Sequence, residues 1–327
     1  MEDALTAAIA PFDPSSCLIF AKDRLLFEYY RDESAARDKA KIYSCTKSVL
    51  SALLCIAFDR GLLPGPETPA ETFFPALARA ADERKRRITL RHLLTMTAGF
   101  EWTEFGGLNS FPRMTRSPDW VGFVLALPLS DEPGVRMEYN SGVSQLLSAV
   151  LAQAAGMPTA RFAEQHLFGP LGIEDYYWER DPQGIHTGGF GLRLLPQDML
   201  KFGLLLLQKG TWNGRRLLSA EMITASTRTA VRSGPPRPGG YGWHWWTGVQ
   251  AVAPGAEAAP APALEYFYAR GYGGQFIYVV PALEAVVVLT RDRWRKGSRQ
   301  PDVFGERLLP VLAGGRPTDR QSSSFYH

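Results

Sequence analysis

The sequence predicts an α+β fold in which one antiparallel sheet is flanked by helices and interrupted by a mostly helical insertion. Three observations carry this prediction. Two strand-like runs lie within residues 16–30, residues 61–185 are helical runs separated by Pro- and Gly-rich loops, and three more strand-like runs lie within residues 265–291. Residues 1–60 and 186–327 should therefore form one lobe around the sheet. The inserted residues should form a second, helical lobe, with the active site in the cleft between the two.

The N-terminal part is predicted to start with a hairpin and to continue into a buried helix. Residues 16–21 and 25–30 are rich in apolar and aromatic side chains, and residues 22–24 supply a turn between them. Residues 45–58 are almost all apolar or small, so a helix here should be buried on every side. Gly61 marks the place where this helix ends.

The middle of the chain is predicted to be helical. Thr89 can cap a short helix that ends at Leu94, and residues 100–120 read as a long loop rich in aromatic residues and glycine. A longer helix should run over residues 143–155 and stop at Gly156. Long ordered loops in compact domains are often functional, so the loop is a candidate wall of the active site.

The C-terminal part mixes helices and strands. Helices are predicted for residues 196–208, 219–228 and 303–312. Strands are predicted for residues 241–249, 265–270, 275–280 and 285–291. The glycine- and proline-rich residues 233–240 should form a loop. The Ala/Pro-rich residues 251–263 should be a flexible surface insertion, and the tail after Gly314 should be disordered.

The composition is that of an ordinary folded protein and argues against several functional classes. The chain has 327 residues, 45% of them hydrophobic and 21% charged. Its net charge of +3 is too small to indicate nucleic acid or a membrane as a partner. The five histidines lack the spacing of a metal site, so we expect no metal and no cofactor. The expected partner is a small-molecule substrate, and a homodimer stays open.

Cysteine usage and the N-terminus indicate a cytoplasmic protein. The three cysteines provide no disulfide framework. The first residues lack the basic and apolar regions of a signal peptide, and the sequence contains no run of 18 apolar residues. A cytoplasmic location argues against a periplasmic cell-wall enzyme.

Ser44 and Lys47 form the strongest chemical signal in the sequence. They are three residues apart at the start of the most apolar helix, so their side chains share one face. A serine hydroxyl becomes a good nucleophile when a neighbouring base takes its proton, and a lysine can be that base when burial lowers its pKa. The N–H groups at the start of a helix also suit an oxyanion. A serine cap followed by an ordinary lysine is the alternative interpretation.

Two further stretches could complete such a site. Tyr139 stands ahead of the helix at 143–155 and could carry a proton, although this feature alone favours a buried tyrosine next to an ordinary helix cap. Residues 271–275 place three glycines between two strands, where a substrate could approach the backbone closely. A glycine-rich hairpin turn is the alternative there.

Taken together, these stretches resemble a known superfamily. The chain resembles the serine β-lactamase/penicillin-binding-protein-like superfamily, in the branch of class C β-lactamases, family VIII esterases and 6-aminohexanoate-dimer hydrolases. It is most similar to the 6-aminohexanoate-dimer-hydrolase-like group. The motifs that carry the resemblance follow one another in order: Ser44-Cys45-Thr46-Lys47, residues 90–100, Tyr139-Asn140-Ser141-Gly142, Leu171-Gly172-Ile173, residues 188–203 and Gly271-Tyr272-Gly273-Gly274-Gln275.

The resemblance implies a β-lactamase/transpeptidase-like fold and a role for each motif residue. Ser44 would be the acylated nucleophile, Lys47 its base and Tyr139 the proton carrier. The oxyanion hole would consist of the N–H groups of Ser44 and Tyr272. The candidate substrate-binding residues are Trp102, Glu104, Ser141, Trp243, Gly271 and Gly273, with Tyr241, Trp245 and Trp246 as further aromatic candidates.

The sequence departs from the superfamily pattern at two places. Ser141 stands where the superfamily often has Asn, and the Lys-Thr-Gly or His-x-Gly triad is missing, with Arg270 near that place. His186-Thr187-Gly188 has the letters of the triad but falls in a predicted loop. The missing cation removes a natural partner for a carboxylate of a β-lactam or peptide.

The resemblance implies a serine hydrolase (amidase or esterase) that cleaves small amides or esters through an acyl-enzyme on Ser44, as 6-aminohexanoate-oligomer hydrolases do. A family VIII-type carboxylesterase and a β-lactamase or D-peptidase stay open as alternatives. So does a penicillin-binding-like sensor that is acylated without turning over.

Overall fold

The computed structural model describes residues 1–234, 239–251, 263–293 and 302–314. Its centre is one antiparallel sheet of eight strands in the order β2-β1-β13-β12-β11-β10-β9-β8. The strands are β1 Ser16–Ala21, β2 Arg24–Tyr30, β8 Val231–Ser233, β9 Gly239–Tyr241, β10 Trp246–Ala251, β11 Ala263–Gly271, β12 Gln275–Val280 and β13 Ala285–Thr290. The predicted antiparallel sheet is thereby confirmed.

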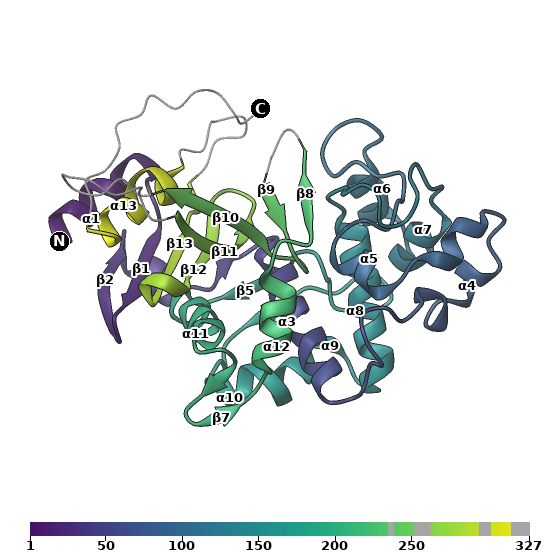
Figure 1. Ribbon diagram of the computed structural model, residues 1–327, viewed down its shortest axis with the longest axis horizontal. Helices are drawn as coiled ribbons and strands as arrows, with labels where there is room; N and C mark the ends of the chain where they lie inside the picture. Colours follow the sequence, from purple (N-terminus) through teal and green to yellow (C-terminus); the bar gives the residue numbers. More distant parts are fainter. Residues whose placement is uncertain (235–238, 252–262, 294–301, 315–327) are drawn as a thin grey trace.

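The two ends of the chain meet in this sheet. Strand β1 pairs with β13 in a register that places Ser16 opposite Thr290, and the two hydroxyls are 2.6 Å apart. Figure 1 shows the N-terminal β1 and β2 directly beside the C-terminal β12 and β13. One sheet is thus assembled from two distant parts of the sequence.

Helices cover both faces of the sheet, because its central strands are apolar on both sides. In β13, Val286 and Val288 face one core while Val287 and Leu289 face the other. The first core is closed by α3 (Cys45–Asp59) and α11 (Pro196–Leu207), and the second by α1 (Glu2–Ile9) and α13 (Leu309–Leu312). Figure 1 shows α11 and α1 on opposite sides of the strands.

The remaining helices lie mostly between the two parts of the sheet in the sequence. They are α2 Glu33–Arg37, α4 Pro75–Ala78, α5 Leu90–Leu94, α6 Ser110–Arg116, α7 Trp120–Ala126, α8 Ser141–Ala155, α9 Thr159–Ala163, α10 Gly169–Leu171 and α12 Ala220–Thr227. Short 3₁₀ turns are Ala10–Phe12, Ala70–Thr72, Glu83–Arg87 and Pro281–Leu283, and π-helical turns are Glu164–Phe168 and Phe304–Leu308. Helix α8 packs against α3, which carries Ser44 at its start. The division into two lobes with a cleft between them stays a prediction.

Two small sheets complete the described structure. One joins β3 Ala40–Lys41, β5 Leu192–Leu194 and β4 Tyr177–Trp178, and the other joins β6 Thr211–Trp212 and β7 Arg215–Arg216. Strand β3 ends three residues before Ser44 and pairs with β5, which begins three residues after Gly189. This pairing brings the segment around residue 189 next to the start of α3.

Several predicted boundaries were wrong for local physical reasons. Residues 100–120 are not a continuous loop, because α6 forms within them. Helix α8 begins at Ser141, ahead of the predicted residue 143, because the Asn140 side chain accepts hydrogen bonds from the N–H groups of Gly142 (2.7 Å) and Val143 (3.1 Å). Within the predicted loop 233–240, Gly239 and Gly240 belong to β9.

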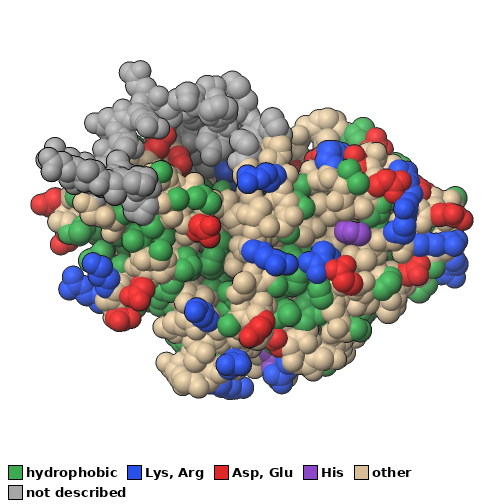
Figure 2. All heavy atoms as spheres, viewed as in Figure 1, with side chains coloured by type: hydrophobic (Ala, Val, Ile, Leu, Met, Phe, Trp, Pro, Cys, Tyr) green, Lys and Arg blue, Asp and Glu red, His purple; other side chains and the backbone are tan. Residues whose placement is uncertain are grey.

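Other predictions fall partly outside the described residues. Most of the Ala/Pro-rich stretch 251–263 and the tail after Gly314 lie there. Within the described ranges, no helix combines the length and the apolar character that crossing a bilayer requires. Figure 2 shows basic and acidic side chains interspersed over the visible face, as the small net charge leads one to expect.

Candidate active site

Ser44 lies in a sharp turn directly before α3. The preceding residue, Tyr43, has φ of 47°, in the left-handed region that is unfavourable for a tyrosine. Such strain costs about 1–3 kcal/mol and is found most often at functional sites. Ser44 itself is partly accessible to solvent, while the helix that follows is buried from Cys45 through Ala57. The serine thus stands at the accessible N-terminal end of a helix whose middle is enclosed.

Lys47 is buried beneath Ser44 and is held by three hydrogen bonds. Its side chain is 1% exposed, and its Nζ lies 3.2 Å from Ser44 Oγ, 2.9 Å from Ser141 Oγ and 2.8 Å from the carbonyl oxygen of Gly189. None of these three partners is a carboxylate. The predicted contact between Ser44 and Lys47 is present, and the amine is directed at it from a desolvated site.

Tyr139 brings its ring to the same amine. Lys47 Nζ lies 4.7 Å from the ring centroid, and the ring is stacked on Trp246 with centroids 6.0 Å apart. Tyr241 packs edge-on against the other side at 6.4 Å. Among the described residues, no hydrogen bond joins the Tyr139 hydroxyl to Ser44 or Lys47. The structure therefore gathers all three predicted catalytic residues, with the phenol not yet bonded to the other two.

Gly189 fits tightly against Ser141 and Lys47. A Cβ atom built there would lie 3.0 Å from Ser141 Cβ and 3.2 Å from Lys47 Nζ. A larger residue would therefore crowd both Ser141 and the amine, which would have to shift by a few tenths of an ångström. The backbone carbonyl can approach Lys47 because no side chain intervenes.

A buried carboxylate lies behind Ser141. Glu104 is 9% exposed, and its Oε2 accepts hydrogen bonds from the Ser141 N–H (2.9 Å) and from Trp102 Nε1 (2.8 Å). Its Oε1 accepts a very short hydrogen bond from Ser141 Oγ. Trp102, Glu104 and Ser141 were predicted to bind substrate, but their polar groups are engaged with one another and, through Ser141, with Lys47.

The turn between β11 and β12 reaches the Ser44 segment through Gly271. A Cβ atom there would lie 2.2 Å from the carbonyl oxygen of Ile42, so the end of β11 touches the backbone just ahead of the nucleophile. Gly273, with φ of 79°, and Gly274, with φ of 106°, complete the tight turn. The close approach anticipated at this glycine-rich turn is therefore made by the protein's own chain.

Three exposed aromatic rings form a rim beside Ser44. The Tyr272 ring, 39% exposed, lies 5.8 Å from the Tyr43 ring and 6.0 Å from the Phe105 ring, which is 61% exposed. They come from the β11–β12 turn, the turn before α3 and the loop that carries Glu104. We call Tyr43, Phe105 and Tyr272 the aromatic rim. Tyr43 and Phe105 were not among the predicted site residues, although Phe105 lies in the loop 100–120 that was predicted to be functional and Tyr43 directly precedes Ser44.

Other predicted site residues lie away from this cluster. Trp243 is buried and packs against Phe58 near the far end of α3, with ring centroids 6.3 Å apart. Trp245 is buried against Phe202 and Phe267 in the core under the sheet. The structure does not bring these two indoles to Ser44. Trp246 is closer to the site, because it stacks on Tyr139, whose ring lies against Lys47.

Arg270 cannot replace the missing cation of the superfamily triad at Ser44. Strand side chains alternate between faces, and Arg270 stands opposite Phe276, with the guanidinium carbon 5.9 Å from that ring centroid. Phe276 belongs to the core beneath α1 and α13, on the face of the sheet opposite α3. His186 lies in a loop, as expected, and its backbone carbonyl accepts a hydrogen bond from Ser148.

A second pair consists of Ser144, one turn into α8, and His244 from the segment between β9 and β10. Ser144 Oγ lies 2.9 Å from His244 Nε2, His244 Nδ1 lies 2.9 Å from the Leu94 carbonyl, and Ser48 donates to the His244 carbonyl at 2.7 Å. Burial, reinforced by the nearby charge of Lys47, lowers the pKa of His244 to about 3. All of these groups are buried, so this pair has no access to a substrate.

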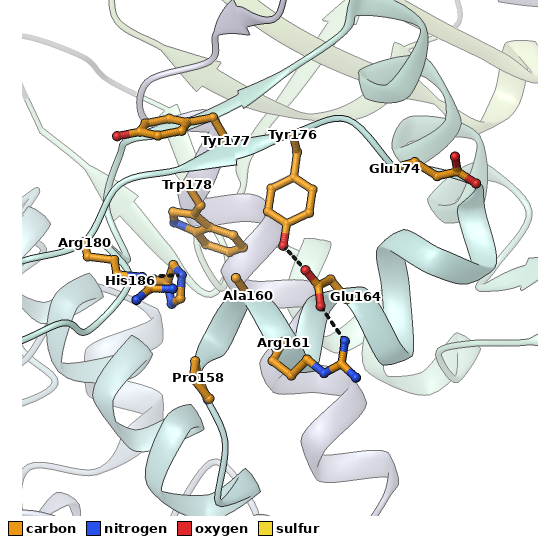
Figure 3. Close-up of a pocket in the computed structure, with 10 residues that line it drawn as sticks. All are labelled: Pro158, Ala160, Arg161, Glu164, Glu174, Tyr176, Tyr177, Trp178, Arg180 and His186. Carbon is orange, nitrogen blue, oxygen red and sulfur yellow. Dashed lines mark hydrogen bonds and ion pairs between the residues drawn. The ribbon is translucent and has the colours of Figure 1, made fainter.

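A surface cavity of about 520 Å³ lies elsewhere, over α9 and β4. Figure 3 shows that its wall includes Arg161, Glu164, Tyr176 and His186, with Glu164 bonded to both Arg161 and the Tyr176 hydroxyl. Burial, next to Arg180, lowers the pKa of His186 to about 4. The cavity contains neither Ser44 nor Lys47, and its polar groups are largely paired, so we place the chemistry at Ser44.

In the described ranges, no group of three or more His, Cys, Asp or Glu side chains is arranged to hold a metal ion.

The chain is similar in sequence to known proteins. Protein Rv1367c from Mycobacterium tuberculosis is 24% identical over 272 residues, covering 67% of each chain. The D-alanyl-D-alanine-carboxypeptidase/endopeptidase AmpH from Escherichia coli is 28% identical over 145 residues, covering 43% of this chain and 37% of AmpH.

The fold is shared with solved structures of low sequence identity. A Bacillus anthracis protein provisionally named a 6-aminohexanoate-dimer hydrolase superposes with a TM-score of 0.75 at 17% identity, covering 95% of this chain and 81% of that one. The family model described as Beta-lactamase matches residues 33–305, a span that contains Ser44, Lys47, Tyr139 and Tyr272. The chain therefore belongs to the beta-lactamase family of serine-hydrolase-type proteins.

Proposed function

We propose that the protein is a serine hydrolase that cleaves small esters or amides through an acyl-enzyme on Ser44. One observation carries the proposal: a lysine that is 1% exposed, with no carboxylate in contact, directs its Nζ at the Oγ of a solvent-accessible serine 3.2 Å away. A desolvated amine is a suitable proton acceptor for a serine nucleophile.

The proposed reaction uses each of these groups in turn. Ser44 Oγ forms a bond to the acyl carbon while its proton passes to Lys47 Nζ. The bond to the leaving group then breaks, and the leaving alcohol or amine takes a proton supplied through Tyr139, whose ring lies against Lys47. Water then attacks the acyl-enzyme, gives up a proton to the same groups and releases the acid, which restores Ser44.

Stabilisation of the oxyanion is assigned to two backbone N–H groups. Ser44 precedes the first turn of the 15-residue helix α3, whose N-terminus favours negative charge. Tyr272 lies in the turn that Gly271 brings against Ile42, and its N–H is the second candidate donor. The two N–H groups would share the negative charge that develops on the carbonyl oxygen.

The surroundings of Ser44 favour an uncharged, apolar acyl group. The aromatic rim of Tyr43, Phe105 and Tyr272 offers ring surface next to the nucleophile. Arg270 lies on the opposite face of the sheet, so it offers no charge to a substrate carboxylate at Ser44. Short-chain, uncharged esters and amides therefore fit better than β-lactams or D-alanyl peptides, whose carboxylate would have no cationic partner in Arg270.

Activity-based labelling with site mapping tests the proposal. A fluorophosphonate probe should modify Ser44, as found by mass spectrometry of the digested protein. Hydrolysis of p-nitrophenyl butyrate should disappear in Ser44→Ala. A probe adduct on another residue would overturn the assignment, and labelling of Ser44 without any turnover would favour the acylated sensor.

The substrate class is decided by a second set of assays. Parallel measurements use p-nitrophenyl acetate and butyrate, the linear 6-aminohexanoate dimer, nitrocefin and a D-Ala-D-Ala peptide. We expect turnover of esters, or of esters and the dimer. Turnover of nitrocefin or of the peptide in preference to these would contradict the argument from the missing cation.

A further inference from the structure

Glu104 is a buried acid for which the proposed reaction has no direct use. Its two carboxylate oxygens accept three hydrogen bonds, all from Trp102 and Ser141. Both partners are buried, and so is Glu104 itself. A carboxylate engaged in this way is a poor contact for substrate. Its influence on Ser44 must pass through Ser141, which also touches Lys47.

The carboxylate fixes the direction of the Ser141 hydroxyl. A hydroxyl has a single hydrogen to donate, whereas an ionised carboxylate can only accept. The Ser141 hydrogen therefore points at Glu104 Oε1. At its contact of 2.9 Å with Lys47 Nζ, Ser141 Oγ must then be the acceptor.

The same accounting fixes the orientation of the lysine amine. The Gly189 carbonyl, 2.8 Å from Lys47 Nζ, can likewise only accept. In the neutral form, which is the form that can act as a base, the amine has two N–H bonds and one lone pair, and Ser141 and Gly189 use both N–H bonds. Only the lone pair remains for the third neighbour, Ser44 Oγ at 3.2 Å. This is the arrangement that a base needs in order to remove the proton of Ser44.

We propose that Glu104 is a positioning residue that orients the lone pair of Lys47 toward Ser44 through the hydroxyl of Ser141. The inference rests on the proposed function, because it assumes that Lys47 is the base. It also gives Ser141 a definite role. Because its hydroxyl donates to Glu104, its oxygen must accept a hydrogen bond from Lys47.

Glu104→Gln tests the inference because it keeps the shape and reverses the polarity. The two N–H groups at the Oε2 position, from Trp102 and Ser141, can only donate, so the amide oxygen must stay there. The amide NH₂ then faces Ser141 Oγ and donates to it. The Ser141 hydroxyl then donates its hydrogen bond to Lys47 Nζ, so the lone pair of the amine is no longer available to Ser44. We expect kcat for p-nitrophenyl butyrate to fall about 100-fold, the range of general-base catalysis, with KM little changed.

Ser141→Ala provides the decisive comparison. Removing the hydroxyl deletes one contact of Lys47 but leaves nothing to occupy its lone pair, so we expect a smaller fall, about 10-fold. In the Ser141→Ala background, Glu104→Gln should change kcat by less than about 2-fold, because its route to Lys47 is gone. A purely structural role of Glu104 would not be suppressed in this way.

The control is Glu101→Gln, which removes a carboxylate from the same loop at an exposed position and should leave kcat unchanged. Should Glu104→Gln fail to fold, as judged by its melting temperature, Glu104→Ala replaces it. That variant frees the Ser141 hydroxyl instead of reversing it, so it should lose about 10-fold, again suppressed by Ser141→Ala.

The rate of fluorophosphonate labelling of Ser44 serves as a second readout that needs no turnover. Equal rates in wild type and Glu104→Gln, or losses that multiply fully in the double variant, would overturn the inference while leaving the proposed function intact. Absence of labelling and hydrolysis in the wild type would overturn both.

Discussion

Two serine-containing pairs lie near the start of α3 and in α8, and they differ in what surrounds them: Ser44 with Lys47, and Ser144 of α8 with His244 from the segment between β9 and β10. Ser44 and Lys47 stand at the partly exposed start of α3, beside the aromatic rim. Ser144 and His244 are the residue types more often found as nucleophile and base, yet both are sealed in the core. His244 uses both ring nitrogens on protein groups. The two pairs therefore differ in the solvent accessibility of the serine and in whether the nitrogen of the base is already engaged by other protein groups. The residue types do not make this difference.

The largest expected difference between the pairs is in turnover. Ser44→Ala should lower kcat by about 10⁴-fold or more, because the acyl bond cannot form. Ser144→Ala should change kcat less than about 3-fold, although it leaves His244 Nε2 without its partner and lowers stability by about 1–3 kcal/mol. Steady-state hydrolysis of p-nitrophenyl butyrate and urea unfolding measure the two effects. A collapse of kcat in Ser144→Ala with unchanged stability would break the comparison.

Turnover at Ser44 and Lys47 should also depend on the hydroxyl of Tyr139. Tyr139→Phe keeps the ring that covers Lys47 and stacks on Trp246 but removes the hydroxyl. We expect kcat to fall about 10²-fold through loss of proton transfer, with a normal melting temperature. Tyr177→Phe, at an exposed tyrosine of β4, is the matched control and should retain full activity. Unchanged activity in Tyr139→Phe would remove the phenol from the mechanism.

The buried pair of Ser144 and His244 should instead affect how the stability of the protein depends on pH. The pKa of His244 is lowered from 6.5 to about 3 by burial, so the native protein holds it neutral. The unfolded chain takes up a proton below about pH 6.5, and stability is lost as the pH falls from there toward 3. Between about pH 7.5 and about pH 5, this residue should account for a loss of about 2 kcal/mol.

Urea unfolding of wild type and His244→Gln at both pH values isolates this contribution. The variant should be less stable at about pH 7.5 but should lose about 2 kcal/mol less on acidification. The pKa of His186, lowered to about 4, contributes in the same direction and cancels in the difference. An identical acid-induced loss in both proteins would contradict the assignment.

The smallest expected effect concerns the rim that makes the first pair accessible. Phe105→Ala removes an exposed ring that packs on Tyr272. We expect a KM for p-nitrophenyl butyrate raised about 3- to 10-fold, since a few CH₂ contacts are lost, and little change for the acetate. Equal effects on both esters would show that the rim does not contact the acyl chain. Leu108→Ala, at another exposed apolar residue of this loop, is the control.

Local patterns in the sequence were sufficient for much of the fold. The strands at β1, β2, β11, β12 and β13 were predicted because alternating or continuous apolar runs end at clear turn residues. The contact between Ser44 and Lys47 follows from their spacing on one helix. Both kinds of inference depend on neighbours within a few positions along the chain.

Contacts between distant segments could not be derived in this way. Gly189 reaches Lys47 across 142 positions and Glu104 reaches Ser141 across 37, and only the complete fold sets these distances. The run of aromatic residues from Tyr241 to Trp246 illustrates the limit. The chain bends at His244, which has φ of 59°, so these residues do not form the single strand that was predicted. Trp243 packs against Phe58 near the end of α3, whereas Trp246 stacks on Tyr139.

The pairing of Ser16 with Thr290 has a consequence for how the molecule comes into being. During synthesis the N-terminal hairpin emerges early, but its partner β13 leaves the ribosome only after some 260 further residues. Until then the outer edge of β1 has no neighbour, and such edges invite unwanted association. Gly271, which supports the backbone before Ser44, arrives almost as late. A chain that stops before β11 and β13 therefore contains Ser44 without the backbone that supports it, and we expect hydrolysis only from chains that extend through β13.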